Sequence, residues 1–384
     1  MGVKMKINAS CVIIGAGING CTLAYELALN GMKDIVVVEK NFIASGATGR
    51  CGGGIRQQWS TPMNIKFAVE SVHIFEKLDE MLNYKTEYFQ GGYLILAYTD
   101  EEVNQFEKNV RLQKSLGLEV DIISAEQAKK IVPRLNVDGV KAATYCATDG
   151  HANPFYVTQA YAQKAKELGV KFLLDTEVHS IVTEGNNIKS VTTNKGNINT
   201  DTVINASGGY AHLIAKMLNI DIPVKPYRHE ILVTEPVNRI IDPMIISFYH
   251  SIYFRQELNG GILMGQGDPN EPSSFNVEGS FPFVQEVTSK VLKLMPCLKN
   301  VAMVRQWAGL YSVTPDAQPI LGPVGDFEKF IQVVGFSGHG FMLAPRVAQH
   351  LSNYIINGNT SYEMKELSIK RFENAQLNVD VNVV

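Results

Sequence analysis

Three glycines and one glutamate near the N-terminus have the types and spacing of a dinucleotide-binding turn. The glycines, Gly15, Gly17 and Gly20, follow an apolar run at residues 11–14. The first permits a sharp turn, the second lets backbone N–H groups approach a pyrophosphate at a helix N-terminus, and the third allows helix and strand to pack closely. Glu39 ends the next apolar run, 19 positions after Gly20, where a carboxylate would accept the ribose hydroxyls of an adenosine. The pattern predicts a βαβ unit that binds a dinucleotide.

A second glycine-rich segment, residues 45–59, follows this acidic residue. Five of the nine residues 46–54 are glycine, which is too many for a regular helix or strand. Such a segment lets backbone amides pass close to a large flat ligand, and Ser45 or Thr48 could reach a pyrophosphate. A flexible surface loop is the alternative, but apolar residues between the glycines, such as Trp59, favour a segment that wraps a cofactor.

The composition excludes several classes of partner. The 384 residues include 35 basic and 38 acidic side chains, so there is no basic field for nucleic acid or an anionic membrane. The five cysteines form no CxxC pair, so no disulfide framework and no metal site are expected. The first strand is predicted within a few residues of Met1, and its apolar run is too short for a signal peptide or a membrane span. We therefore expect a cytoplasmic protein.

The length allows about two domains, and the periodicity indicates that they interleave. Strand, glycine turn and helix recur in that order near residues 202–211 and 331–342, whereas residues 227–311 are mostly strand. The pattern predicts a dinucleotide-binding domain from residues 1–85, 145–220 and 315–384, and a substrate domain with an antiparallel sheet from residues 86–144 and 221–314. The predicted helices are residues 21–28, 65–82, 100–116, 124–133, 155–168, 283–294 and 340–356. The predicted strands are residues 11–14, 35–38, 92–97, 170–173, 177–182, 188–193, 202–205, 227–234, 251–255, 261–265, 301–311 and 331–334.

Several motifs together resemble the D-amino-acid-oxidase-type FAD flavoproteins. They are the N-terminal βαβ unit, the segment 45–59, Ala206-Ser207-Gly208, Thr314-Pro315-Asp316 and the turn Gly335-Phe336-Ser337-Gly338-His339-Gly340. Within that family the chain is most similar to the β-subunits of sarcosine oxidase and dye-linked proline dehydrogenase. The resemblance implies a mixed α/β and α+β fold. In it a glutathione-reductase-like FAD-binding domain is interleaved with an antiparallel-sheet substrate domain, and the isoalloxazine lies where the two meet.

The motifs and the resemblance together imply a set of cofactor-binding residues. Gly309 stands where monomeric sarcosine oxidases carry the cysteine that holds the flavin, so the resemblance implies non-covalent FAD. A β-subunit histidine that carries FMN in heterotetrameric sarcosine oxidase aligns with Pro154, which argues against that covalent link. An FMN shared with a partner subunit remains an open expectation of the resemblance. The residues expected at FAD are Gly15, Gly17, Ile18, Asn19, Gly20, Glu39, Lys40, Ser45, Thr48, Gly49, Arg50, Cys51, Gly53, Val178, Ala206, Gly208, Gly309, Gly338, His339, Gly340, Phe341 and Met342.

The resemblance also points to residues around a substrate. Tyr253 and Tyr311 match tyrosines on the substrate side of the flavin, and Arg56 falls near a flavin-side arginine. The lysine that binds the substrate carboxylate in sarcosine oxidase is replaced by Met342. A carboxylate that enters a dry site still needs a cation. The candidates for this cation are Arg56, Arg255 and His229. The catalytic candidates are Arg56, Arg255, His339 and the two tyrosines, whereas His151 is expected to be a hydrogen-bonding residue of a loop.

The expected activity is FAD-dependent oxidation of the C–N bond of a small amino acid, with hydrolysis of the resulting imine. Sarcosine, glycine, proline and hydroxyproline all fit. The lysine thought to activate oxygen falls in the apolar run 262–264, which favours a dehydrogenase that passes electrons to an α-type redox subunit. Two alternatives stay open, a flavin-binding electron-transfer subunit without an amine site and an NAD-dependent dehydrogenase.

Overall fold

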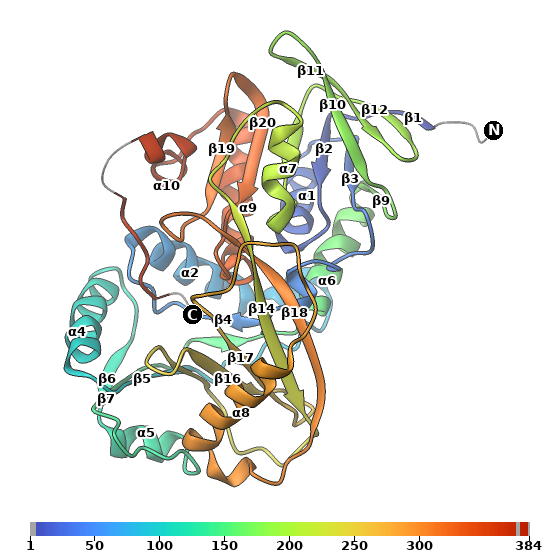
Figure 1. The fold of residues 1–384 in the computed structure, drawn as a ribbon. Coiled ribbons are helices and arrows are strands. Elements are labelled where there is room, and N and C mark those ends of the chain that lie inside the picture. The colour runs from blue at the N-terminus through green and yellow to red at the C-terminus, as the bar shows by residue number, and fades with distance from the viewer. Residues whose placement is uncertain (1–4, 374–376, 383–384) are drawn as a thin grey trace.

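The computed structural model describes residues 5–373 and 377–382 of the chain (Figure 1). A six-stranded sheet has the order β19-β20-β13-β2-β3-β9 and is parallel except for the pair β19–β20. The strands β2 and β3 are buried at every residue, as expected where helices and a second sheet cover both faces. The bounds are β2 Cys11–Ile14, β3 Ile35–Val38, β9 Lys171–Leu173, β13 Val203–Asn205, β19 Ile320–Val324 and β20 Phe327–Val334.

Helices cover one face of this sheet, and a smaller sheet covers the other. On the first face α1 packs against α6 and α9, and α2 packs against α9, around one apolar core. On the second face lie α7 and a four-stranded sheet of order β1-β12-β11-β10. The bounds are α1 Ile18–Leu29, α2 Pro62–Phe75, α6 Pro154–Glu167, α7 Ala211–Lys216, α9 Gly340–Asn357, β1 Met5–Asn8, β10 Val178–Glu184, β11 Asn187–Thr193 and β12 Gly196–Asn199.

An eight-stranded sheet forms the second half of the molecule, at the lower part of Figure 1, with α8 and α5 against one face and α4 against the other. Its order is β18-β14-β17-β16-β15-β5-β7-β6, and every pair is antiparallel except β15–β5. The bounds are β5 Tyr93–Ala97, β6 Asp121–Ile123, β7 Ala142–Cys146, β14 Lys225–Thr234, β15 Met244–Ser247, β16 Ile252–Gln256, β17 Ile262–Gln266, β18 Met303–Val313, α4 Asp100–Ser115, α5 Ala125–Ile131 and α8 Phe281–Leu294. The remaining elements are β4 Gly54–Ile55, β8 Gly150–His151, α3 Leu78–Leu82, α10 Tyr362–Glu366 and the 3₁₀ turns Thr48–Arg50, Gly208–Tyr210, Pro296–Leu298 and Ile369–Glu373.

The fold class is confirmed, and local signals explain most of the agreement. Ser124 and Gln127 form a capping box at α5, and the Asn153 side chain caps α6 before Pro154. The prediction was wrong in several places. The strands that were missed are β1, β4, β6, β7, β8, β12, β15 and β19. The helix at 65–82 is two helices, and the sheet of the substrate half contains the parallel pair β15–β5. That pair joins the chain segments 86–144 and 221–314, and pairing between distant segments leaves no trace in local periodicity.

The strands of the two large sheets come from the predicted chain segments, although β7 crosses the boundary at residue 144. The division into two domains remains our proposal. Among the described residues, no helix is long and apolar enough to cross a membrane. In the same part of the chain, no group of three or more His, Cys, Asp or Glu side chains could hold a metal ion.

Candidate functional site

In the glycine turn between β2 and α1, backbone segments pack so closely that a side chain would not fit. Gly15 has φ +110°, and a Cβ there would lie 2.5 Å from the carbonyl oxygen of Ala206. A Cβ on Gly20 would lie 1.9 Å from the carbonyl oxygen of Gly15, so Gly20 serves helix packing. Gly17 is the N-cap of α1 and supplies no capping side chain, so the positive end of the helix dipole is open to an anion.

Glu39 is fixed at the end of β3 by three donors. Its carboxylate accepts hydrogen bonds from the backbone N–H groups of Ala16 and Asn41, both at 2.9 Å, and from the Ser45 hydroxyl at 3.2 Å. The Thr48 hydroxyl accepts a hydrogen bond from the backbone N–H of Ile18 at 3.0 Å. The segment after Glu39 is thereby tied back to the glycine turn.

A cavity of about 330 Å³ opens at the carboxyl ends of β2, β3, β13 and β20, where parallel α/β sheets bind ligands. Its lining includes the predicted cofactor residues Gly15, Gly17, Ile18, Asn19, Glu39, Lys40, Ser45, Thr48, Arg50, Cys51, Val178, Ala206, Gly208, Gly338, Gly340 and Phe341. The prediction missed other lining residues, among them Thr176, Tyr210, Met217, Val277 and Phe336. Tyr210 stands in the turn after Ala206-Ser207-Gly208, so its position in the sequence could have indicated it.

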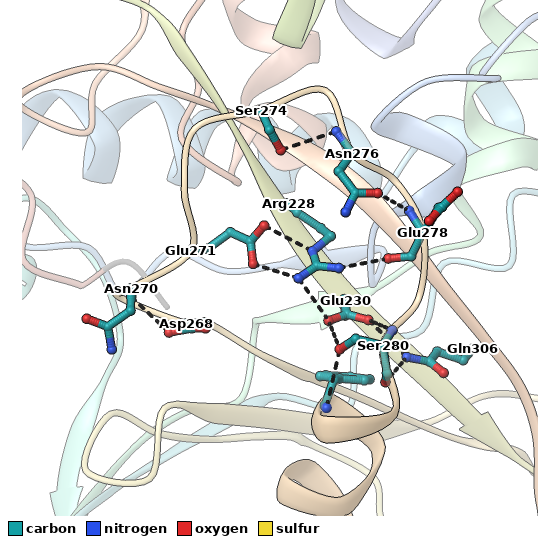
Figure 2. A network of polar contacts seen from close by, with 11 residues as sticks. Arg228, Glu230, Asp268, Asn270, Glu271, Ser274, Asn276, Glu278, Ser280 and Gln306 are labelled. Carbon is teal, nitrogen blue, oxygen red and sulfur yellow. Dashed lines mark hydrogen bonds and ion pairs between the residues drawn. The ribbon is translucent and has the colours of Figure 1, made fainter.

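The loop 267–280 supplies Val277 to this lining, and Figure 2 shows how the loop is held. Arg228 on β14 donates two hydrogen bonds to the Glu271 carboxylate, at 3.0 and 2.9 Å, and one to the carbonyl of Glu278. Glu230 accepts from both the N–H and the hydroxyl of Ser280, at 2.6 and 2.8 Å. Alternate residues of β14 therefore anchor the two ends of a wall of the cavity.

A smaller cavity of about 80 Å³ adjoins the larger one, and Cys51, Tyr311, Gly338 and Phe341 line both. Its walls are largely aromatic and apolar. The other residues in its lining are Gly52, Gly53, Gly54, Arg56, Trp59, Tyr93, Met244, Ile246, Tyr253, Ser337 and Met342. The prediction placed Gly53 and Met342 at the cofactor, and they line the smaller cavity instead.

Arg56 is the only arginine or lysine in the lining of this smaller cavity within the described residues, and it is 4% exposed. Its guanidinium stacks on the Trp59 ring at 3.9 Å, and its Nη2 donates to the backbone carbonyl of Asn382. Its Nη1 has no hydrogen-bond partner among the residues that the structure describes. Burial lowers the pKa of the guanidinium, which is the direction expected for a cation with little solvent. An anion in the cavity would supply the missing acceptor.

Arg255 is also buried, at 1% exposed, but its donors are already used. Nε donates to the Gly52 carbonyl at 2.6 Å, Nη2 to the Glu257 carboxylate at 2.8 Å, and Nη1 lies 3.1 Å from Nδ1 of His151. Among the described residues, neither cavity has Arg255 in its lining. The structure therefore disfavours Arg255 as a carboxylate-binding candidate, because the fold gives every nitrogen of its guanidinium an internal partner.

His151 is the acceptor on the other side of that contact, and it does not lie in a loop. It belongs to β8, which pairs with β4, and it is 2% exposed. Burial, with a smaller contribution from Arg255, lowers its pKa well below the usual range. The expected hydrogen-bonding role is found, but in a buried strand that supports the segment 45–59.

Three aromatic rings form a parallel stack at one wall of the smaller cavity. The His229 ring is nearly parallel to the rings of Tyr253 and Tyr311, with centroid distances of 5.6 and 4.3 Å and interplanar angles of 6° and 5°. Its Nε2 is 3.1 Å from the Tyr253 hydroxyl. Burial lowers the pKa of His229 to about 4 and raises the pKa of both tyrosines. Burial therefore favours a neutral His229 that supports the tyrosines, and it disfavours His229 as the cation for a carboxylate.

His339 caps α9 but stays out of both cavity linings as far as the structure describes them. It packs on Trp59 with the ring centroids 4.5 Å apart, and burial lowers its pKa to about 4. A catalytic cation at this position is therefore disfavoured. Gly49 and Gly309 also lie outside the linings: their Cβ atoms would meet the Ala44 carbonyl at 2.4 Å and the Arg50 side chain at 3.0 Å, so both permit packing around the site.

Comparison with proteins of known activity gives relatives of similar length and relatives about twice as long. The chain is 28% identical to mitochondrial dimethylglycine dehydrogenase of Rattus norvegicus over 96% of its residues, but it spans only 45% of that protein. It is 27% identical to sarcosine oxidase subunit beta of Arthrobacter sp, and the match covers 97% of this chain and 93% of that subunit. The solved L-proline dehydrogenase from P. horikoshii is 40% identical, with a TM-score of 0.93 over 97% of this chain and 100% of that chain.

A family match decides between the two nucleotide cofactors that the βαβ unit had left open. Residues 10–354 match the family described as DAO, FAD dependent oxidoreductase. The match includes the glycine turn, the segment 45–59 and the turn before α9. The NAD-dependent alternative was therefore wrong. The chain belongs to the DAO family of FAD-dependent oxidoreductases.

Proposed function

We propose that the larger cavity holds FAD without a covalent bond. The N-terminus of α1 at Gly17 would meet the pyrophosphate, and Glu39 would meet the ribose. Two observations support this fit: a Cβ at Gly15 would clash with a backbone carbonyl, and the buried Asn19 Oδ1 has no partner among the described residues. Gly309 stands on β18 where a covalent link would need cysteine.

The chain would use this cofactor to oxidise the C–N bond of a small amino acid in the smaller cavity. FAD supplies the acceptor for a hydride equivalent from the carbon next to the amine. The observation that carries the proposal is Arg56, a buried cation whose Nη1 has no partner among the described residues, in a cavity that shares four lining residues with the larger one. Arg56 would bind the carboxylate, and Tyr253 and Tyr311 would orient the amine carbon and exclude water.

L-proline is our first candidate substrate. The L-proline dehydrogenase from P. horikoshii is 40% identical over its whole length, which supports a similar substrate. Apolar and aromatic walls, with Met244, Ile246 and Tyr93 among them, suit the methylenes of a small ring. Sarcosine, glycine and hydroxyproline are the competitors, and in each case the imine would hydrolyse in water after release.

The test is anaerobic mixing of the purified FAD-loaded chain with each of these four amino acids, followed by the flavin absorbance. Loss of absorbance with L-proline, and a much slower loss with pyrrolidine, which lacks the carboxylate, is the expected result. If none of the amino acids reduces the flavin while dithionite does, the chain is an electron-transfer subunit without its own amine site.

We also propose that electrons leave through a partner and not through O₂. Ile262, Leu263 and Met264 are buried on β17, so this strand offers no cation beside the substrate wall to stabilise superoxide. The sarcosine oxidase β-subunits among the relatives support an α-type redox subunit as partner. Slow reoxidation in aerated buffer together with rapid reduction of an artificial dye is the expected outcome. An FMN shared with that partner and a cytoplasmic location stay predictions.

A further inference from the structure

The C-terminal segment 377–382 returns to the smaller cavity from behind Arg56. Asp380 is 3% exposed and Asn382 is 5% exposed. The Asn382 carbonyl accepts the hydrogen bond from Nη2 of Arg56, although more than 300 residues separate the two in the chain. Neither residue was singled out from the sequence.

Asp380 locks this segment to the residues that follow Arg56. Its carboxylate accepts hydrogen bonds from the hydroxyls of Ser60 and Thr61, at 2.7 and 2.9 Å, and from the Asn64 amide at 2.9 Å. The same carboxylate accepts from the N–H of Asn382 at 3.0 Å. These donors hold the pKa of Asp380 below its usual range despite burial. A buried negative charge is thereby fixed two residues from the carbonyl that holds Arg56.

The Asn382 side chain fixes that carbonyl from the other side. Its Nδ2 donates to the Gln58 carbonyl at 3.0 Å, and its Oδ1 accepts from the Asn109 amide at 3.2 Å. Trp59 lies under the guanidinium and donates its own Nε1–H to the Arg56 carbonyl at 2.9 Å. The guanidinium is held by stacking and by Nη2, which leaves Nη1 for a ligand.

We propose that Asp380 and Asn382 are positioning residues of the amine site, which orient Arg56 so that its Nη1, which has no partner within residues 5–373 and 377–382, meets the substrate carboxylate. This inference rests on the proposed function, because it assigns the carboxylate to Arg56. It predicts that substitutions in the C-terminal segment weaken the binding of ligands that carry a carboxylate and leave the binding of ligands without a carboxylate unchanged. A segment that served only folding would affect both kinds of ligand, or neither.

The experiment measures two quantities in the FAD-loaded chain. One is the dissociation constant of pyrrole-2-carboxylate, read from the flavin absorbance; the other is the KM ratio of L-proline to pyrrolidine. The variants are Asp380→Asn and Asn382→Ala, with Val381→Ala as a control because that side chain is exposed in the same segment. We expect both test variants to raise the dissociation constant and the KM ratio about tenfold. Val381→Ala and the bound FAD of all three variants should match the parent, and Asp380→Glu should recover part of the loss.

Two results would overturn the inference, and a third would overturn its premise. Unchanged carboxylate binding in both variants means that the segment does not position Arg56. If the KM values of L-proline and pyrrolidine rise equally, or if FAD is lost in parallel with carboxylate binding, the role of the segment is structural. If Arg56→Met itself leaves pyrrole-2-carboxylate binding unchanged, the proposed function fails at its carboxylate anchor. A loss in Arg56→Met without a loss in the segment variants would remove only the inference.

Discussion

The two cavities are built by different means, although they share a wall. The larger one is shaped by backbone: Gly15 and Gly17 at the first turn, and the N-terminus of α9 at Gly340. The smaller one is shaped by side chains from distant strands, and its polarity depends on which arginine keeps a free donor. Backbone features such as glycine turns can be predicted from neighbouring residues in the sequence. Whether a side-chain donor lacks a partner depends on residues from distant segments that pack around it. The smaller cavity is therefore where substitutions should be most informative.

Arg56 and Arg255 make this contrast measurable within one region. Both are buried. Arg56 belongs to the segment 45–59 and Arg255 donates to its Gly52 carbonyl, but only Arg56 has an unpartnered nitrogen among the described residues. Substitution of the first should impair ligand binding, and substitution of the second should impair folding. The predictions below begin with the largest expected effect.

Arg56→Met should weaken the binding of L-proline by about 2–5 kcal/mol, which corresponds to a KM raised roughly 30-fold to several thousand-fold, because a buried carboxylate loses its charged partner. FAD content should not change. KM for L-proline and flavin content after gel filtration are the measurements, and Arg111→Met, at an exposed position on α4, is the control. An unchanged KM would erase the contrast between the two arginines.

Arg255→Met should lower the free energy of unfolding by ~2–4 kcal/mol, because it leaves His151, the Gly52 carbonyl and Glu257 without their donor. Chemical denaturation of the FAD-loaded chain measures this loss. Arg255→Lys, which retains one charged donor, should recover part of it. A normal stability combined with a raised KM would show that Arg255 binds the substrate after all.

Acid should destabilise the chain through His229. Its pKa is about 4 in the folded chain against the usual 6.5, so the unfolded chain binds more protons between these values. The stability that comes from burying neutral His229 is complete above pH 6.5 and is lost as the pH falls towards 4. Relative to His229→Gln, the parent should lose on the order of ~2–3 kcal/mol over this range. Parallel pH profiles of the two unfolding free energies would contradict this account.

Glu39→Ala should weaken FAD retention by ~1–3 kcal/mol, since a charged acceptor for the ribose hydroxyls is lost. The effect is the smallest because the backbone of the larger cavity stays in place. Glu39→Gln should retain part of the binding. Equilibrium dialysis of FAD tests this prediction, and an unchanged dissociation constant would mean that the cavity needs no carboxylate at β3.

The sequence indicated the features that depend on neighbouring residues. The turn at Gly15, the Asn153 cap of α6 and the helix that starts at Gly340 follow from local composition, and the structure contains them. The features it could not indicate depend on contacts between distant segments. Asp380 beside Ser60 and the parallel pair β15–β5 are examples.

The substrate side shows the same limit more sharply. From the sequence, Arg56 and Arg255 are both candidates for the cation that binds the substrate carboxylate. Their roles differ because Arg255 has three hydrogen-bond partners, Gly52, His151 and Glu257. Gly52 and His151 are far from Arg255 in the sequence, so these contacts cannot be predicted from it. The loop that brings Val277 to the larger cavity likewise carries no signal of its own, because its position follows from Arg228 and Glu230 on β14.

A thermodynamic cycle between Arg56 and the substrate carboxylate tests the central claim most directly. The anaerobic rate of flavin reduction is measured in the parent chain and in Arg56→Met, each with L-proline and with pyrrolidine over a range of concentrations. If Arg56 binds the carboxylate, the two changes are coupled by about 2–5 kcal/mol in the second-order rate constant, because pyrrolidine does not need the arginine. A coupling energy near zero, with both substrates slowed equally, would contradict the assignment of the smaller cavity as an amino-acid site.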